Sequence, residues 1–324
     1  MKILITGSSG FIGSHLVEHF ISRRFKVVAF DRYNSNNDLG WLDTSKYKDK
    51  IKFVLGDIRD YDSVYKSMKG CDVVIHLAAL IGIPYSYFSP TAYVKTNIEG
   101  TLNILEAAKN LNIKQIIITS TSEVYGSSLN GKLREIDELK AQSPYSASKI
   151  AADQLSLSFF RSFNLPIKII RPFNTFGPRQ SARAVIPTIL TQALTTQKIK
   201  IGNINAIRDF LYVSDLCLAY EKILKNKKLI GEIINVGAET EISIKDLIKK
   251  ISHLTKLKLK IVIDKKRIRP IKSEVTRLKC DNSKLKKYTD WKVNVNLETG
   301  IKHFIEWLKK DKNLNHYKVD KYNI

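Results

Sequence analysis

Short apolar runs alternate with longer amphipathic stretches through the first half of the chain. The runs at 2–6, 72–76 and 115–119 are almost wholly apolar, which is typical of parallel strands buried on both faces. Stretches with helical spacing follow these runs, and the longest lie at 90–111 and 145–163. Because strands and helices alternate in this way to about residue 175, the pattern predicts an α/β fold with a doubly wound parallel sheet.

The second half of the chain is less regular and predicts a smaller C-terminal lobe. Helical spacing over 184–195 and 243–253 alternates with short apolar runs near Ile199 and at 259–263, and a last helix is expected over 297–310. We interpret this part as a substrate-binding lobe interleaved with late strands of the sheet. The predicted divisions are a cofactor-binding domain at 1–175, the lobe at 176–312 and a polar, frayed tail at 313–324.

A glycine-rich turn lies between the first predicted strand and the helix that follows it. Gly7 allows a tight turn, Gly10 lets the backbone approach a pyrophosphate at the helix N-terminus, and Gly13 allows the helix to pack closely against the strand. A strand before the motif and a helix after it are the context that a dinucleotide-binding turn requires. We therefore predict a Rossmann-type domain that binds its cofactor through Gly7, Gly10, Phe11, Ile12 and Gly13.

Residues at the ends of later strands extend the predicted cofactor site. Asp31 follows the second strand, where a carboxylate accepts hydrogen bonds from the adenosine ribose and repels a 2′-phosphate, so it favours NAD over NADP. The neighbouring Arg32 works against that preference. Asp57 follows the third strand, where it either contacts the adenine amino group or caps the next helix. The other predicted cofactor contacts at strand ends are Ile58, Leu77, Ala78, Ala79 and Ser120.

Tyr145 and Lys149 lie one helical turn apart in a predicted helix, so their side chains project from the same face. An ammonium group beside a phenol favours the phenolate, so we expect Lys149 to lower the pKa of Tyr145 and make it a general base. Such pairs also occur by chance on helix surfaces, and the surrounding motifs strengthen the prediction. With Thr121 and Glu123, which follow the fifth predicted strand, Tyr145 and Lys149 form the predicted catalytic set.

Composition and charge narrow the choice of partners. The 324 residues include 54 Lys and Arg against 31 Asp and Glu, a net charge of +23, and 27 of the basic residues lie after residue 220. The lysines are scattered along amphipathic segments rather than interleaved with aromatic residues, so we favour a solvated basic surface over nucleic-acid binding. Three widely spaced cysteines, no long apolar run and no signal-peptide pattern lead us to expect a cytoplasmic protein without metal or membrane partners.

The motifs together resemble those of the extended short-chain dehydrogenase/reductase superfamily, and they occur in its order. This resemblance implies that the N-terminal domain holds a nicotinamide cofactor and that the substrate is a nucleotide sugar. The matching segments are Gly7-x-x-Gly10-x-x-Gly13, Asp57-Ile58, His76-Leu-Ala-Ala79, Tyr145-x-x-x-Lys149, Arg171-Pro-Phe-Asn174 and Arg208-Asp-Phe.

Within the superfamily, the segment Thr121-Ser122-Glu123 is similar to that of GDP-mannose 4,6-dehydratases, whereas dTDP-glucose 4,6-dehydratases have Asp where Ser122 stands. Longer runs resemble the NAD-dependent 4,6-dehydratases of legionaminic acid biosynthesis, which implies GDP-N-acetylglucosamine as the substrate. By this resemblance Tyr145 removes the proton from the O4 hydroxyl, to which Thr121 is hydrogen-bonded, and C4 is oxidised. Glu123 then takes the C5 proton, and water is eliminated across C5 and C6. Hydride finally returns to C6. The runs are 40–44, 83–87, 179–187 and 269–274.

Basic and polar residues of the second half are candidates for binding the substrate. Arg208 and Arg269 are expected on the diphosphate, because an Arg fork makes paired hydrogen bonds to phosphate oxygens. Asn174 follows the sixth strand, where an amide reaches the diphosphate or the sugar. Arg183 is either a further substrate contact or ordinary surface charge, and Ile186 is expected to pack on the nucleobase.

Other functions remain open from the sequence. NDP-uronate decarboxylases also carry Thr-Ser-Glu, and Arg183 would then face the carboxylate of the sugar. A UDP-sugar 4-epimerase and a non-catalytic NAD(P)- or nucleic-acid-binding protein of the same fold are further alternatives, although the proton-transfer set argues against a binding module. The apolar stripes of 90–111 and 145–163 are broad enough to predict a homodimer contact beside the sheet.

Overall fold

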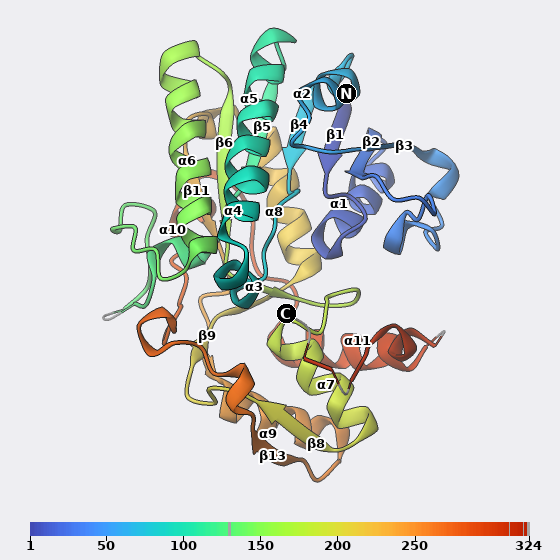
Figure 1. Cartoon of the computed structure of the whole chain (residues 1–324), viewed down its shortest axis with the longest axis vertical. Helices are drawn as coiled ribbons and strands as arrows, with labels where there is room; N and C mark the ends of the chain where they lie inside the picture. Colours follow the sequence, from blue (N-terminus) through green and yellow to red (C-terminus); the bar gives the residue numbers. More distant parts are fainter. Residues whose placement is uncertain (129–130, 311, 320, 323–324) are drawn as a thin grey trace.

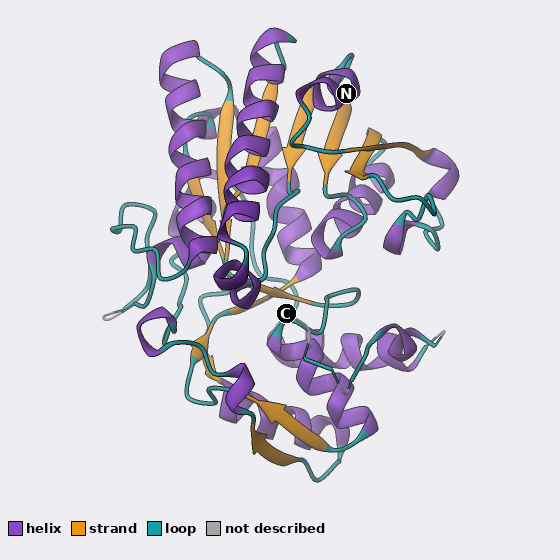
Figure 2. Cartoon of the chain, in the orientation of Figure 1, coloured by secondary structure: helices purple, strands orange, loops and turns teal. Residues whose placement is uncertain are grey.

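The chain folds around a sheet of 7 parallel strands in the order β11-β6-β5-β4-β1-β2-β3, which confirms the predicted doubly wound sheet (Figures 1 and 2). This computed structural model describes residues 1–128, 131–310, 312–319 and 321–322. The strands are β1 (Lys2–Thr6), β2 (Lys26–Arg32), β3 (Ile51–Gly56), β4 (Val73–His76), β5 (Gln115–Thr119), β6 (Ile167–Pro172) and β11 (Ile233–Val236).

Helices cover both faces of this sheet (Figure 2). Side chains alternate between the faces along each strand, so Ile3 and Ile5 pack with α1 and α8, whereas Leu4 packs with α2, α5 and α6. A sheet buried on both faces needs strands without polar positions, which explains the uninterrupted apolar runs. The helices are α1 (Phe11–Ser22), α2 (Tyr61–Met68), α5 (Gly100–Asn110), α6 (Pro144–Phe163) and α8 (Val213–Lys225).

The helix predicted over 90–111 is not continuous. It consists of α4 (Pro90–Tyr93), a π-helical segment η3 (Val94–Glu99) and α5. Asn97 lies buried in the π-helical segment, and its side chain accepts from the Leu80 N–H and donates to the Leu80 carbonyl and to Ser148 Oγ. The widened turn therefore accompanies a polar side chain that links this helix to the strand end after β4 and to α6.

The lobe packs beneath the carboxyl ends of the strands (Figure 1). Its core joins residues such as Leu190, Leu247 and Phe304 from three helices. Beside them, β8 and β13 form a parallel pair, and β7 pairs with β10 and β9 with β12. The helices are α7 (Val185–Thr195), α9 (Ile244–Thr255) and α11 (Leu297–Lys309), and the strands are β7 (Asn174–Phe176), β8 (Lys198–Ile201), β9 (Ile207–Arg208), β10 (Phe210–Tyr212), β12 (Ile242–Ser243) and β13 (Lys260–Ile263).

The chain passes between sheet and lobe repeatedly. After β6 it enters the lobe through α7 and β8, and α8 and β11 then return it to the sheet. It goes back to the lobe with α9 and β13, and returns once more with α10 (Ser283–Tyr288), where Leu285 and Trp291 are buried in the core beside α8. Only then does it end in the lobe with α11. The two halves are therefore interleaved in sequence.

Part of the tail predicted at 313–324 has secondary structure. A short helix, η8 (Asn313–His316), places His316 and Trp307 against Trp41, with ring centroids 5.2 and 5.4 Å away. The phenol of Tyr317 donates to the Gln180 carbonyl at 3.0 Å. Aromatic contacts and this hydrogen bond thus connect the segment to Trp41 and to the loop before α7, although none of its described residues is buried. Residues 311, 320, 323 and 324 lie outside the described part of the chain.

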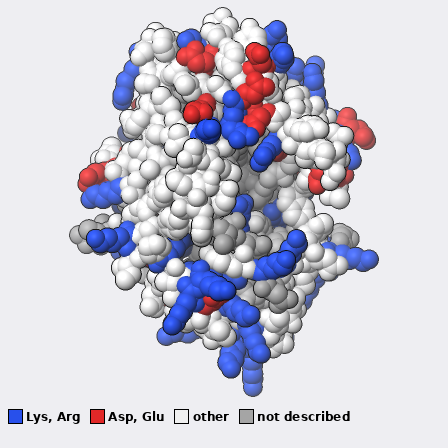
Figure 3. Space-filling view, in the orientation of Figure 1, with Lys and Arg blue, Asp and Glu red and all other residues white. Residues whose placement is uncertain are grey.

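Charge is distributed unevenly over the surface. Figure 3 shows Lys and Arg side chains crowding the lower part of the molecule, which the lobe forms, with few acidic side chains among them. None of the helices in the described residues is both long and apolar enough to cross a membrane. The described residues also hold no group of three or more His, Cys, Asp or Glu arranged to bind a metal ion.

Candidate active site

A cleft of about 1020 Å³ lies between the carboxyl ends of the strands and the lobe. This is where ligands bind in open parallel sheets. Every residue that the sequence predicts for cofactor, catalysis or substrate lines this cleft. The cofactor candidates come from the strand ends and α1, the catalytic candidates from the end of β5 and from α6, and the substrate candidates mainly from the lobe. The fold therefore brings the predicted set together, while the individual roles stay predictions.

The turn between β1 and α1 has the shape that a pyrophosphate needs. Gly7 has a φ of +68°, and a Cβ there would lie 2.9 Å from the Ala78 nitrogen. A Cβ on Gly13 would lie 2.1 Å from the Gly7 carbonyl oxygen, so neither position tolerates a side chain. Gly10 is the N-cap of α1, and neither a capping side chain nor an acidic residue occupies its first turn. The N–H groups of that turn are therefore available to an anion.

The two acidic residues at the strand ends have different partners. Asp31 accepts hydrogen bonds from the Ser9 N–H at 2.6 Å and the Ser9 hydroxyl at 2.5 Å, which ties the end of β2 to the glycine turn. Asp57 is held by the Arg59 guanidinium, which lowers its pKa. The alternative role of Asp57 as a helix cap is wrong, because Asp60 caps α2. With the glycine turn, these carboxylates fit the adenosine end of a dinucleotide.

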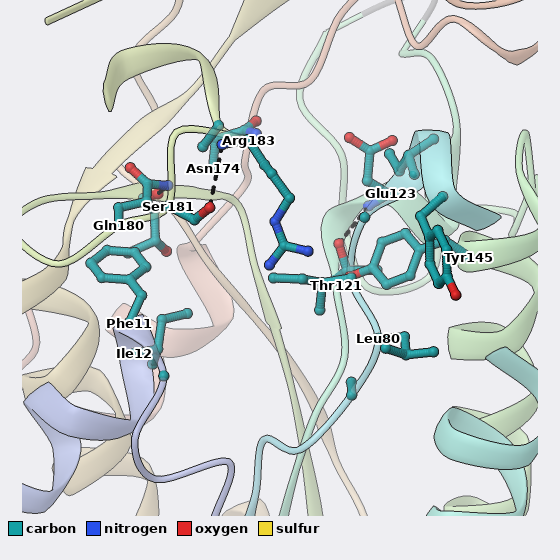
Figure 4. Close-up of a pocket in the computed structure, with 18 of the residues that line it drawn as sticks. Phe11, Ile12, Leu80, Thr121, Glu123, Tyr145, Asn174, Gln180, Ser181 and Arg183 are labelled. Atoms are coloured by element: carbon teal, nitrogen blue, oxygen red, sulfur yellow. Dashed lines mark hydrogen bonds between the residues drawn. The ribbon is translucent and has the colours of Figure 1, made fainter. Parts of the chain in front are cut away.

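The catalytic candidates lie on two neighbouring elements. Thr121 caps the short helix η4 (Ser122–Tyr125), and its hydroxyl accepts from the Glu123 N–H at 3.2 Å. Tyr145 is in the first turn of α6 and is buried. Figure 4 shows Thr121, Glu123 and Tyr145 together at one side of the pocket. Ser122 is only 2% exposed and is not among the residues that line the cleft. It is therefore not placed to exchange protons with a ligand.

The expected effect of Lys149 on the pKa of Tyr145 is wrong for this structure. Burial raises the pKa of Tyr145, because the phenolate loses its hydration, and a side-chain hydrogen bond with Thr121 only partly offsets this. The Lys149 ammonium instead donates to the Thr119 carbonyl at 2.6 Å. Burial also lowers the pKa of Lys149 to about 8, against the opposing charge of Asp153. Desolvation, which local sequence spacing does not reveal, therefore dominates both groups.

A buried ion pair that the sequence analysis missed lies under the catalytic residues. Asp153 accepts from the Ser120 hydroxyl at 2.9 Å and from Arg171 Nε at 3.0 Å. Arg171 also donates to the Tyr125 hydroxyl at 2.9 Å. These contacts fix α6 against β5 and β6. The sequence signals are the position of Asp153 one turn after Lys149 and the motif that begins at Arg171, and neither shows that the two residues pair.

The candidate substrate-binding residues of the lobe differ in how many of their polar groups already have hydrogen-bond partners in the protein. Arg208 donates to the Val275 carbonyl at 2.7 Å and lies 3.6 Å from Glu274, so most of its guanidinium is engaged. Burial lowers the pKa of Arg208. By contrast, Arg269 Nη1 and Asn174 Oδ1 are buried without a hydrogen-bond partner in the described part of the chain. Arg269 and Asn174 are therefore the better donor and acceptor for a ligand.

Arg183 lies at the catalytic end of the cleft, just before α7. Ile186 follows in the first turn of α7. The Arg183 guanidinium reaches into the pocket toward Thr121 (Figure 4). A Cβ on Gly82 would lie 3.6 Å from Arg183 Nη1. Burial raises the pKa of Tyr93 to about 12, and the positive charge of Arg183 partly offsets this rise. Arg183 is exposed, and its guanidinium points toward the centre of the site. Ile186 is buried and lines the cleft at the start of α7.

The parallel sheet, the glycine turn and the Tyr145–Lys149 pair define an extended short-chain dehydrogenase/reductase. The profile of the family described as "GDP-mannose 4,6 dehydratase" matches residues 4–304. The chain therefore belongs to the GDP-mannose 4,6-dehydratase family.

Relatives of known activity within this similarity carry out different reactions. A dTDP-D-glucose 4,6-dehydratase of Dictyostelium discoideum is 35% identical over 272 residues, which is 78% of this chain but only 62% of that protein. A UDP-N-acetyl-alpha-D-glucosaminuronate decarboxylase of Bacillus cytotoxicus is 33% identical over 96% of this chain and 99% of its own. The structure of a UDP-glucuronic acid 4-epimerase from Bacillus cereus, solved with UDP-glucuronic acid and NAD, has a TM-score of 0.87 and 30% identity over 95% of this chain and 99% of its own.

Proposed function

We propose that this chain is a NAD-dependent nucleotide-sugar 4,6-dehydratase. Its expected substrate is GDP-N-acetylglucosamine, its product the 4-keto-6-deoxy sugar, and its pathway legionaminic acid biosynthesis. The observation that carries the proposal is the position of Glu123, a carboxylate in the same cleft as Thr121, Tyr145 and Lys149. A proton acceptor beside an oxidation site is what elimination after C4 oxidation requires. The choice of GDP rests on the resemblance of the longer sequence runs.

The residues of the sheet suit the cofactor of this reaction. NAD, when bound, would supply the oxidation at C4 and the later reduction at C6. The free N–H groups of Phe11, Ile12 and Gly13 would bind its pyrophosphate, and Asp31 would accept hydrogen bonds from the adenosine ribose. The Ala78 backbone lies so close to Gly7 that a side chain at residue 7 would not fit between them. The Bacillus cereus relative solved with NAD supports the same assignment.

Thr121, Tyr145 and Lys149 would handle the proton of the O4 hydroxyl. Because burial raises the pKa of Tyr145, the free protein holds it as a neutral phenol. Tyr145 must release its phenolic proton before it can act as a base. We assign Lys149 the role of stabilising the phenolate that then accepts the O4 proton, since the ammonium lies one turn away on α6 and is fixed by the Thr119 carbonyl. Thr121 orients the same hydroxyl. Oxidation at C4 then makes the C5 proton acidic.

Glu123 would perform both proton transfers of the elimination. It takes the proton from C5 and passes it to the departing C6 hydroxyl, so one water is lost. When hydride returns to C6, C5 regains a proton, and the proton that Tyr145 took from O4 balances this step. Ser122 is buried outside the cleft lining and does not protonate the departing hydroxyl. Glu274 is the carboxyl on the lobe side of the cleft, but it faces Arg208 at 3.6 Å. A single carboxyl that acts first as base and then as acid is chemically sufficient.

Product analysis by mass spectrometry tests this proposal directly. The purified protein is incubated with NAD and, separately, with GDP-N-acetylglucosamine, UDP-N-acetylglucosamine and a UDP-uronic acid. We expect loss of one water from the GDP sugar. Water loss from the UDP sugar alone would keep the reaction and change the nucleobase. No change in mass with any substrate would contradict the dehydratase, and an unchanged mass with inverted C4 stereochemistry would identify an epimerase.

The position of Arg183 favours one second candidate, a uronate decarboxylase. Its guanidinium points into the catalytic end of the cleft, where a cation would pair with a C6 carboxylate. The Bacillus cytotoxicus decarboxylase, 33% identical over 96% of this chain, supports this alternative. The oxidation at C4 would be the same, and carbon dioxide would leave in place of water. Loss of carbon dioxide from the UDP-uronic acid in the same experiment would establish it.

A further inference from the structure

The segment after α11 reaches the cleft from the lobe. Tyr317 anchors it through the Gln180 carbonyl, 3.0 Å from its phenol oxygen. Lys318, Val319 and Lys321 then border a small recess together with residues of α7 and Arg267. The next residue, Tyr322, is half-buried and lines the main cleft. The described residues 312–319 and 321–322 thus lie between the outer side of the lobe and its ligand-facing side.

Tyr322 faces two arginines at the edge of the cleft. The guanidinium carbon of Arg267 lies 4.6 Å from the centroid of the Tyr322 ring, and Arg267 Nε donates to Asp264 at 3.2 Å. Arg269 is close enough for its charge to act on the phenol, although burial raises the pKa of Tyr322 overall. Arg267 is therefore held between a carboxylate and an aromatic face. Arg269 keeps a buried N–H group without a partner in the described residues.

This combination has the chemistry that recognises a nucleoside diphosphate. An aromatic ring held by a guanidinium offers a flat apolar face to a base or ribose, and an arginine with an unused N–H donates to phosphate oxygens. Ile201, Ala206 and Ile244 of the lobe line the same cleft and add apolar surface to it. The reacting groups Thr121, Glu123 and Tyr145 belong to the sheet side.

We propose that Tyr322 is a binding residue for the nucleoside diphosphate part of the substrate, and that the contacts of Tyr317, Lys318, Val319 and Lys321 with the lobe hold it at the cleft. The ring contacts the base or ribose, while Arg269 donates to the diphosphate. The proposal rests on a nucleotide sugar as substrate, but it does not depend on which reaction follows. Tyr322 acts on binding and takes no part in proton transfer.

The test measures binding of GDP and of UDP alone, by calorimetry, to the full chain. Tyr322→Ala should weaken the better-bound nucleotide about tenfold, within the range for a base stacked on an aromatic ring. Tyr322→Phe should keep the wild-type affinity because the ring is retained. Tyr288→Ala is the matched control, since Tyr288 ends α10 and does not line the cleft. With a nucleotide sugar that turns over, Tyr322→Ala should raise KM and leave kcat nearly unchanged.

Three results would overturn the inference. They are wild-type affinity in Tyr322→Ala, an equal loss in Tyr322→Phe, and a wild-type protein that binds neither nucleotide. Failure of the proposed reaction looks different, because the wild-type protein would then bind GDP or UDP through Tyr322 and yet release no water from any sugar nucleotide. Circular dichroism of each variant checks that the fold is intact.

Discussion

The ammonium of Lys149 donates a hydrogen bond to the backbone carbonyl of Thr119 at 2.6 Å. This contact ties α6 to the last residue of β5, just before Thr121 and Glu123 in the chain. Because Tyr145 lies one turn before Lys149 on the same helix, the bond also fixes the distance between the phenol and the residues that follow β5. Lys149 therefore orients the site in addition to carrying charge.

The pKa of Lys149 predicts an alkaline limit to activity. Burial lowers it from its ordinary value to about 8, so the ammonium is lost as the pH rises through that value. We expect kcat to fall above about pH 8 with the slope of a single proton. Initial rates between about pH 6 and 10 measure this. In Lys149→Arg the charge persists at every such pH, so the alkaline decline should disappear, and a decline identical to that of the wild-type protein would refute the assignment.

Replacement of Glu123 should separate oxidation from elimination. Glu123→Gln keeps the size of the side chain but removes the proton acceptor, so water loss should drop by about 10²–10⁴-fold. Reduction of the cofactor by substrate, followed by its absorbance, should remain measurable. Ser122→Ala is the control and should eliminate water at close to the wild-type rate, because Ser122 does not line the cleft. Near wild-type elimination by Glu123→Gln would show that another group takes the C5 proton.

Arg183 should act on the sugar rather than on the nucleotide. It lies beside Gly82 and acts on Tyr93, whose ring centroid is 6.2 Å from that of Tyr145. Arg183→Ala should therefore raise KM for the nucleotide sugar about tenfold, through the loss of about one charge-assisted hydrogen bond, and leave the Kd for GDP unchanged. Calorimetry with GDP and steady-state kinetics give the two numbers. Equal losses in both would place Arg183 on the diphosphate instead.

The outward face of η3, α5 and α6 is the expected homodimer contact. Val94 is 45% exposed, Leu102 36% and Phe163 51%, although all three are apolar. We expect a dimer, and Leu102→Glu should dissociate it into particles of 37.0 kDa, because the substitution buries a charge in the contact. Sedimentation equilibrium measures the mass. Ile136→Glu, at an 82% exposed site on a loop, is the control that should stay dimeric. A monomeric wild-type protein would rule the contact out.

His76 should make the fold sensitive to acid. Its ring is buried between the hydroxyls of Thr6, 2.8 Å from Nδ1, and Thr101, 3.2 Å from Nε2, and burial lowers its pKa from 6.5 to about 3. Below pH 6.5 the unfolded chain binds a proton that the folded chain rejects, so stability falls as the pH falls. The loss from this group is about 2 kcal/mol between about pH 6.5 and 5.

Denaturant titrations of wild-type protein and His76→Gln at several pH values test this. The variant should be less stable at neutral pH, because its hydrogen bonds are altered, but should lose less stability on acidification. Some acid sensitivity should remain, since burial also lowers the pKa of His15, to about 4. Parallel stability curves for the two proteins would show that His76 does not cause the acid sensitivity.

The sequence predicts which residues line the cleft better than it predicts their pKa values and their ion pairs. The glycine turn, Asp31 and the Tyr145–Lys149 pair are each recognised from residues that are close together in the sequence. Their spacing is therefore enough to locate them. The raised pKa of Tyr145, by contrast, depends on how completely the fold excludes water. The Asp153–Arg171 pair and the approach of Tyr322 to Arg267 join segments that are distant in sequence, and no local pattern contains them.

The repeated passage of the chain between sheet and lobe constrains how the molecule forms and how it can be altered. The edge strand β11 and the core residue Trp291 follow elements of the lobe in the chain, so the N-terminal domain lacks part of its sheet until part of the lobe has been made. The sheet and the lobe therefore complete their folding together, unlike domains that fold in succession. For the same reason the lobe cannot be moved into another protein as one continuous segment. A graft between relatives would carry sheet elements with it, so a change of substrate has to proceed through individual side chains.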